Sequence, residues 1–202
     1  MGEQLIISIG REYGSGGHAI AEILAKRFEL PMYDRNLLDH IAEEKGVDVN
    51  VLNKYDEKAN NVFLSRRVRG FSNSPEEAIA EMQFDFIKDK AKKGESFVIV
   101  GRCSETILRG CEGLVSIFVL ADKEVKNERI MKIRNVSSKE AQNIMNRHDL
   151  LRKVYHNRYC DVKWGDSRNY DISVNSSRLG IERTADMLES YIKERTGNKQ
   201  NW

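Results

Sequence analysis

The sequence lacks the features that mark disulfide-rich or zinc-binding proteins. Its three cysteines, Cys103, Cys111 and Cys160, are odd in number and form no CxxC pair. A disulfide framework is therefore not expected, and reduced, buried thiols in a cytosolic protein fit the sequence better. The four histidines are scattered, and we see none at ligand spacing from a cysteine, which disfavours a zinc site. The sequence alone assigns no residue as a metal ligand.

Proline, charge of one sign and long apolar runs are scarce too. Two prolines in 202 residues leave no proline-rich linker, and we find no repeat, which favours a single domain over residues 1–202. Thirty-three basic and 31 acidic residues give a net charge of +2, so we expect no nucleic-acid partner and only a local anion site. The apolar segment near the N-terminus spans about five residues, shorter than a signal-peptide core or a membrane span. We therefore expect a cytoplasmic protein without a membrane partner.

What the chain does contain is an alternation of short apolar runs and helical patterns. Runs typical of strands occupy residues 5–9, 97–100, 115–120 and 170–175. Amphipathic patterns predict helices over about 20–28, 37–42, 75–93, 122–160 (broken near 135–138) and 180–195. This order predicts an α/β fold in which helices cover both faces of a parallel sheet. Ligands bind such sheets at the carboxyl ends of the strands, which here bring together residues 10–18, 101–102 and 121–122.

A glycine-rich turn joins the first predicted strand to the first helix. Glycines in this place let main-chain N–H groups converge on an anion, and the helix dipole adds to the attraction. The predicted phosphate-binding residues are Gly10, Gly14, Ser15, Gly16, Gly17 and His18. A tight turn with no ligand also needs glycine, so a purely structural turn is the alternative.

The turn departs from the Walker pattern GxxxxGK[ST]. With Gly16 as its second glycine, the lysine position holds Gly17 and the hydroxyl position holds His18. We hypothesise that Arg11 supplies the missing cation and Ser15 the missing hydroxyl, because both lie close in sequence. His18 is more commonly a helix-start residue than a general base.

Four segments taken together resemble the cytidylate-kinase-like proteins, relatives of cytidylate kinase among the nucleoside monophosphate kinases. They are ISIGREYGSGGHAIAEILA, MYDRNLL, VIVGRCSETIL and NRHDLLRKVYHNRY, and the match extends over nearly the whole chain, most weakly between about 46 and 95. The resemblance implies a three-layer P-loop kinase fold with a sheet of about five strands. It also implies a helical acceptor-side insert at about 36–95 and a lid at about 135–165.

The resemblance assigns roles to individual residues. Gly101-Arg102 match a Gly-Arg-Asp motif whose arginine holds the acceptor phosphate, with Cys103 in place of the aspartate. Asp149 and Arg152 match a lid motif that contacts acceptor ribose and phosphate, and Arg129 matches an arginine facing the donor nucleotide. The implied catalytic residues are Arg11, Asp34, Arg102, Arg129 and Arg152, and the implied acceptor-binding residues are Asp34, Arg35, Arg102, Arg147, Asp149 and Arg152.

Several arginines also fit phosphoryl transfer on chemical grounds, since their planar guanidinium groups bind phosphate oxygens in pairs and stay charged. Each has a plainer interpretation as part of a solvated helix face, and Asp34 could simply cap the next helix. We expect a kinase that uses ATP with Mg²⁺ and acts on a nucleoside monophosphate such as CMP. The alternatives are a kinase of a non-nucleotide small molecule, a nucleotide- or phosphate-binding regulatory domain, and an interaction domain whose helices between 48 and 95 form a homodimer.

Overall fold

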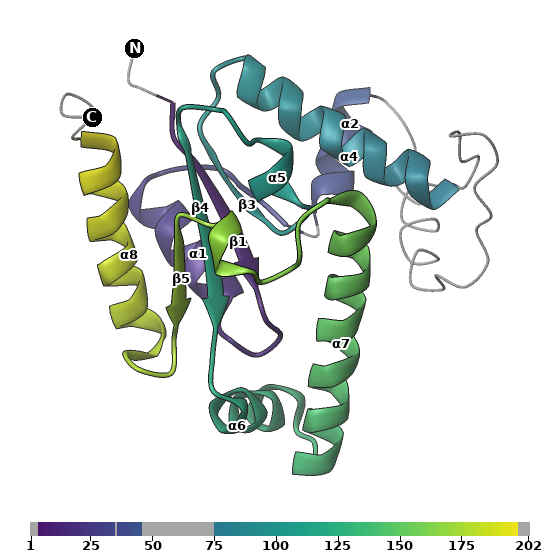
Figure 1. Ribbon diagram of the computed structural model, residues 1–202, viewed down its shortest axis with the longest axis vertical. Helices are drawn as coiled ribbons and strands as arrows, with labels where there is room; N and C mark the ends of the chain where they lie inside the picture. The colour runs from purple at the N-terminus through teal and green to yellow at the C-terminus, as the bar shows by residue number, and fades with distance from the viewer. Residues whose placement is uncertain (1–3, 35, 46–74, 198–202) are drawn as a thin grey trace.

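Five parallel strands form the centre of the molecule (Figure 1). The computed structural model describes residues 4–34, 36–45 and 75–197. The strands are β1 (Ile6–Arg11), β2 (Met32–Tyr33), β3 (Phe97–Val100), β4 (Leu114–Leu120) and β5 (Ile172–Asn175). They lie in the order β2-β3-β1-β4-β5, with every neighbouring pair parallel. The four apolar runs predicted as strands are confirmed, whereas the two-residue β2 was too short for its pattern to be noticed.

Strand β1 is buried on both faces, as the apolar run at its position predicts. Ile6 belongs to the core on one side of the sheet, and Ile7 and Ile9 belong to the core on the other side. Its central place lets it pair with β3 and β4 along its length, from Ile6 opposite Phe97 onwards. The loop that follows β1 therefore leaves the middle of the sheet.

Helices cover both faces of the sheet, which gives the three layers expected for this fold (Figure 1). Helices α1 (Gly17–Arg27) and α8 (Gly180–Gly197) pack on the face that carries Ile7. Helices α2 (Leu37–Lys45) and α4 (Pro75–Lys92) pack on the other face, next to the short α5 (Ser104–Ile107). Helix α4 begins at its proline as predicted, while Ser74 and the rest of residues 46–74 lie outside the described residues.

The predicted break in the long helical stretch separates α6 (Lys123–Arg134) from α7 (Ser138–Tyr159). Asn135 ends α6 in the left-handed conformation, with φ of 52°. The Ser137 hydroxyl accepts from the Glu140 N–H, and the Glu140 carboxylate accepts from the Ser137 N–H, so the expected cap is a capping box. Helix α7 then runs beside the carboxyl ends of the strands (Figure 1). A short 3-10 turn, η1 (Ser167–Asn169), leads into β5.

Among the described residues, no helix combines the length and the apolar character needed to cross a membrane.

Candidate functional site

The glycine turn between β1 and α1 forms a hollow at the sheet edge. Gly14 and Gly16 both have φ of 82°, in the region that favours glycine. The first helical N–H to bond backward is that of Ile20, to the Gly16 carbonyl at 3.0 Å, so the N–H groups before it have no acceptor within the helix. These groups border a cavity of about 510 Å³. The arrangement is suited to an anion such as a phosphate.

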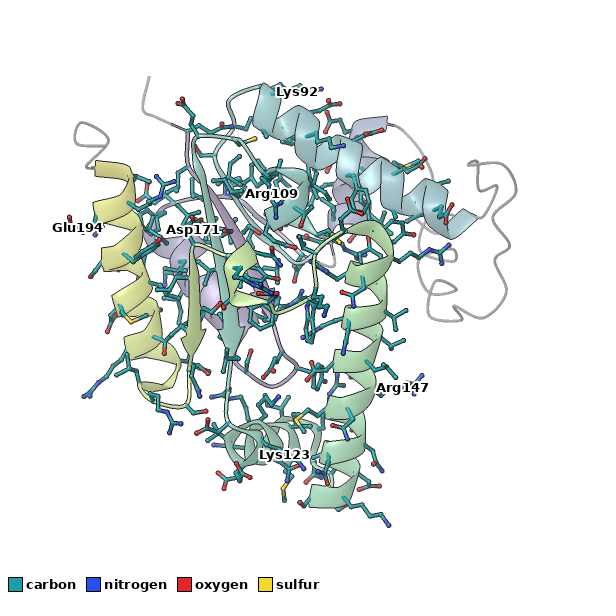
Figure 2. All side chains as sticks on the ribbon, viewed as in Figure 1. Lys92, Arg109, Lys123, Arg147, Asp171 and Glu194 are labelled. Carbon is teal, nitrogen blue, oxygen red and sulfur yellow. The ribbon has the colours of Figure 1, made fainter. Side chains whose placement is uncertain are left out.

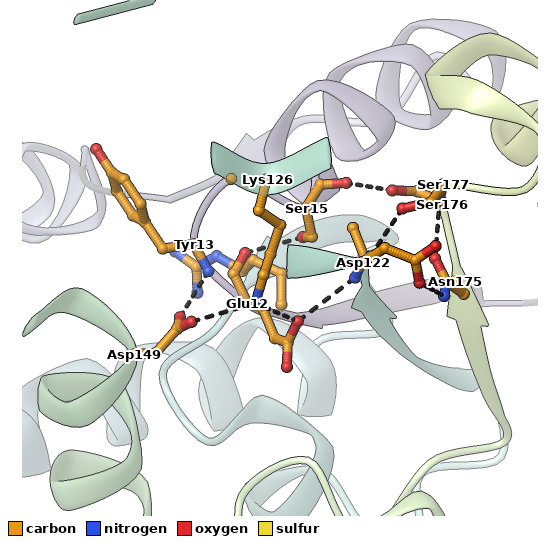
Figure 3. A network of polar contacts seen from close by, with 12 residues as sticks. Glu12, Tyr13, Ser15, Asp122, Lys126, Asp149, Asn175, Ser176 and Ser177 are labelled. Atoms are coloured by element: carbon orange, nitrogen blue, oxygen red, sulfur yellow. Dashed lines mark hydrogen bonds and ion pairs between the residues drawn. The ribbon is translucent and has the colours of Figure 1, made fainter. Parts of the chain in front are cut away.

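Ser15 holds this turn from within. Its fully buried hydroxyl donates to the Glu12 carbonyl at 2.8 Å and accepts from the Gly17 N–H at 3.3 Å. The Ser15 carbonyl in turn accepts from the Ser176 hydroxyl at 2.5 Å, which ties the turn to the segment after β5 (Figure 3). The side chain is therefore engaged in shaping the turn.

Arg11, the last residue of β1, lies between two glycines. A Cβ at Gly17 would stand 2.6 Å from the Arg11 Cβ, and a Cβ at Gly101 would overlap the Arg11 Nη1. The stem of Arg11 thus packs on the start of α1, in the place where a Walker lysine would begin. Its guanidinium reaches the end of β3. Arg11 therefore spans the gap between the glycine turn and the loop after β3.

A second cavity, of about 280 Å³, adjoins the first. Arg11, Asp34 and Arg152 line both cavities. The second cavity is also lined by Arg102 and by the aromatic residues Tyr155, Trp164 and Tyr170. Two hollows therefore share one wall that carries two guanidinium groups and one carboxylate.

Asp34 is placed in this wall by contacts with α1 and α2. Its Oδ2 lies 2.6 Å from the His18 Nε2, and its Oδ1 accepts from the Asn36 N–H at 3.2 Å. The second contact is the turn-capping role that the sequence offered as an alternative, so Asp34 combines a local bond with a place at the junction. His18 lies at the start of α1 with its side chain 48% exposed. Arg35 lies outside the described residues.

Helix α7 holds the glycine turn through its N-terminal half. Asp149 Oδ1 accepts from the Tyr13 N–H at 2.6 Å, and the Arg152 Nη1 donates to the Arg11 carbonyl at 3.0 Å. The His148 ring stacks on Tyr13 at 4.2 Å between ring centroids. Burial raises the pKa of Asp149, although the Tyr13 N–H and neighbouring cations oppose that rise. The lid motif suggested by the sequence thus meets the turn directly in this structure.

A buried lysine from α6 completes this tie (Figure 3). Lys126 Nζ lies 2.8 Å from a Glu12 carboxylate oxygen and 3.7 Å from Asp149 Oδ2. Its side chain is only 9% exposed, so both ion pairs are shielded from solvent. Sequence reasoning missed Lys126 and Glu12, because a charged residue in a charge-rich helix carries no distinguishing signal.

The two remaining predicted arginines differ in position. Arg129 donates from Nη1 to the Gly14 carbonyl at 2.5 Å and lines the larger cavity, and burial lowers its pKa. Arg147 is exposed on α7 and points away from the sheet (Figure 2). It lines neither of the two cavities. The structure therefore brings Arg129 to the site and leaves Arg147 outside it.

The loop after β3 presents the next group of predicted residues. Arg102 and Cys103 both take the left-handed conformation, with φ of 59° and 56°. Burial raises the pKa of Tyr155, and the nearby Arg102 opposes this. The wall opposite is aromatic: Trp164 and Tyr170 both pack on Phe118, with centroid distances of 5.5 and 5.0 Å. Trp164 and Tyr170 were not identified from the sequence, since they follow α7 without any recognisable motif.

Behind Arg102 lies a buried cluster that includes two cysteines. His156 Nε2 lies 2.6 Å from Glu105 Oε1, and Cys160 follows His156 by one helical turn. Cys103 contacts Cys160; this contact and burial raise the pKa of the Cys103 thiol, while contacts with Cys103 and His156 lower that of Cys160. Burial alone lowers the pKa of His156, but Cys160 and Glu105 outweigh it and raise the pKa to about 10. The cysteines are free, as expected, but the spacing of His156 and Cys160 was overlooked in the sequence.

Comparisons with known proteins agree with this geometry. The chain is 25% identical over 191 residues to the cytidylate kinase of Methanocaldococcus jannaschii, which covers 93% of this chain and 97% of that protein. A solved structure of an uncharacterized protein from Eubacterium ventriosum is 40% identical, with a TM-score of 0.75 over 94% of this chain and 99% of the other. Shikimate kinase from Bacteroides thetaiotaomicron shares the fold, with 12% identity and a TM-score of 0.56 over 94% and 98% of the two chains.

A family model decides the assignment. The model of the cytidylate kinase-like family matches residues 6–178, which include the glycine turn, the loop after β3 and the whole of α7. The chain belongs to the cytidylate kinase-like family.

Proposed function

We propose that this protein is a kinase that transfers the γ-phosphoryl group of ATP to the phosphate of a nucleoside monophosphate, with CMP as the foremost acceptor. The observation that carries the proposal is the shared wall of the two cavities, which holds Arg11, Asp34 and Arg152. Direct transfer between two substrates requires the two sites to meet where charge can be stabilised. The family membership and the cytidylate kinase among its relatives support the same reaction class.

The larger cavity suits the donor nucleotide. Its border is the glycine turn, whose N–H groups and helix dipole favour the phosphates. Arg129 lies over the turn and is bonded to the Gly14 carbonyl, so it is positioned to meet a bound phosphate chain. These contacts recognise phosphate and leave the donor base unspecified.

Arg11 takes the role of the Walker lysine in this proposal. Its stem fills the space beside Gly17, where that lysine would start, and its guanidinium reaches Gly101 at the other cavity. A planar guanidinium can bond two phosphate oxygens at once and remains charged, so it can bridge donor and acceptor phosphates. Arg152 supplies a second positive charge at the same junction.

The smaller cavity suits the acceptor. Arg102 and the two shared arginines provide cations for a phosphate, and Tyr155, Trp164 and Tyr170 provide apolar surface for a base. A small acid without an aromatic ring would leave that surface unused, which is why a nucleoside monophosphate fits better than a non-nucleotide acceptor. The side chains of α7 close over both cavities and would exclude water from the transfer.

The junction also fits a magnesium ion bound together with ATP. Asp34, with its side chain 17% exposed, presents a carboxylate to both cavities, and Mg²⁺ in such sites is commonly held by one or two carboxylates and by phosphates. The Ser15 hydroxyl is engaged within the turn, so Asp34 is the residue that we assign to the ion. Bound there, magnesium would neutralise charge on the phosphates.

The test is an assay of ADP formation with purified protein, ATP, magnesium and a panel of nucleoside monophosphates, with shikimate as a non-nucleotide acceptor. We expect turnover that depends on CMP and on magnesium. Turnover with shikimate alone would replace the acceptor assignment. Binding of ATP without any turnover would favour a regulatory domain, and the absence of ATP binding would leave an interaction domain. We further propose a cytoplasmic enzyme that acts without a nucleic-acid partner.

A further inference from the structure

The cluster behind Arg102 contains the donor atoms of a metal site. One ligand atom each from Glu105, His156 and Cys160 lies within 4.8 Å of the other two, and all three residues are buried. Cys103 contacts Cys160 from the opposite side of the cluster. Thiolate and imidazole donors in this combination suit zinc and similar borderline-soft cations far better than magnesium.

The orientation of the histidine is the second observation. The His156 side chain is 5% exposed, and its Nε2 is engaged by the Glu105 carboxylate at 2.6 Å. Its Nδ1 is also buried and has no hydrogen-bond partner among the described residues. Polar atoms buried in this way are rare in folded proteins and call for a ligand. A carboxylate that fixes one ring nitrogen while the other faces a cation is the common arrangement around metal-bound histidines.

The backbone holds the two ligands of α7 in place. Cys160 caps the C-terminus of the helix, and its N–H donates to the His156 carbonyl at 2.9 Å. The spacing of four residues puts both side chains on the same face of the last helical turn. Cys103 reaches the cluster from the turn that leads into α5, where its φ of 56° sets its direction.

We propose that His156 Nδ1 and the thiolates of Cys103 and Cys160 bind one zinc-class cation, with Glu105 orienting the histidine. The fourth position faces the acceptor cavity, which is lined by Cys103, Glu105 and His156 and gives the ion a route in. Three protein ligands and one open position form a recognised class of zinc coordination. The bound ion joins the loop after β3 to the end of α7 and thereby fixes Arg102, the residue next to Cys103.

The test measures metal binding directly and needs no assay of phosphoryl transfer. Protein purified under reducing conditions without chelator is analysed for zinc, then stripped and titrated with Co²⁺. We expect stoichiometric zinc and a cobalt spectrum with thiolate charge-transfer bands and tetrahedral ligand-field bands. Cys160→Ser and Cys103→Ser should lose these bands. Glu105→Gln should keep them with affinity weakened about 10- to 100-fold, as for other partners of metal-bound histidines.

Cys111→Ser is the matched control, because Cys111 is half-buried and lies outside the cluster. It should retain the metal and the spectrum of the wild type. A wild-type protein that binds neither zinc nor cobalt overturns the proposal, as does a cobalt spectrum unchanged by Cys160→Ser. A mass showing a Cys103–Cys160 disulfide in the freshly purified protein also overturns it. If a serine variant fails to fold, a stripped wild type whose melting temperature rises on adding zinc, and does so equally in Cys111→Ser, still supports the site; an unchanged melting temperature rejects it.

Discussion

The two cavities are built by different means. The donor cavity is bordered by one continuous stretch from Arg11 to Ala19, in which main-chain conformation matters more than side chains. The acceptor cavity draws its side chains from β1, β3, α5, α7 and the segment that holds Trp164 and Tyr170. A backbone nest recognises any phosphate chain, whereas a wall of side chains can distinguish one small molecule from another. Specificity should therefore reside on the acceptor side.

Arg11→Ala should have the largest effect, because Arg11 belongs to both cavities. Loss of a positioned cation at the transferred phosphate is expected to lower kcat about 10²- to 10³-fold, as for other preorganised donors. Steady-state kinetics with both substrates varied will measure it. Arg183→Ala, on an exposed part of α8, is the control and should behave as wild type. An unchanged kcat with a raised acceptor KM would place Arg11 on the acceptor side alone.

Arg102→Ala should separate the two cavities. We expect the acceptor KM to rise about 10- to 100-fold, equivalent to about 1.4–2.8 kcal/mol, with the ATP dissociation constant unchanged. Both residues carry a Cβ, so the left-handed conformation at position 102 costs alanine about as much as arginine. Calorimetry with ATP and kinetics with the acceptor provide the two measurements. Equal losses for both ligands would mean that Arg102 does not belong to the acceptor site.

The same contrast explains what the sequence could predict. The strands at 97–100 and 115–120 were identifiable because β-branched runs in a parallel sheet are apolar on both faces. The glycine turn was identifiable because positive φ requires glycine at set positions. The capping box at Ser137 followed from local chemistry alone. Local patterns therefore gave most of the fold and the donor side.

The acceptor side escaped sequence reasoning because its residues are far apart in the chain. Trp164 and Tyr170 reach the cavity only through the packing of the segment after α7, for which no local pattern exists. Glu105 and His156 are 51 residues apart and meet across two helices. The four-residue spacing of His156 and Cys160 was the one local signal available, and it was missed. The direction of Arg11 also required the structure, since only the contacts with Gly17 and Gly101 reveal it.

Gly17→Ala tests the packing on the donor side. Alanine is normally favoured over glycine within a helix, but here its Cβ would meet the Arg11 Cβ at 2.6 Å and the Val119 Cβ at 3.2 Å. We expect a loss of about 1–3 kcal/mol in the free energy of unfolding, measured with urea. Gly197→Ala is the control, because nothing lies within 4 Å of its added Cβ. Equal stability of the two variants would show that Arg11 can move aside, and Arg11 would lose its fixed place.

Asp149→Asn should give the smallest effect, and its sign depends on pH. The side chain keeps an oxygen for the Tyr13 N–H and loses its charge beside Lys126. Burial raises the pKa of Asp149 in the folded protein above its ordinary 3.8, so its ionisation opposes folding. Wild-type stability from this group is complete below that ordinary value and is lost as pH rises through the folded pKa. The asparagine variant does not titrate and should gain stability relative to wild type over that rise.

Urea unfolding of both proteins across this acidic range to neutrality will measure the difference, with the exposed Asp161→Asn as the control. If the variant instead loses stability relative to wild type as pH rises, the attraction of Lys126 outweighs burial. The bond between α7 and the glycine turn would then be an ion pair in its main effect, and the donor side would depend on side-chain charge as much as the acceptor side does.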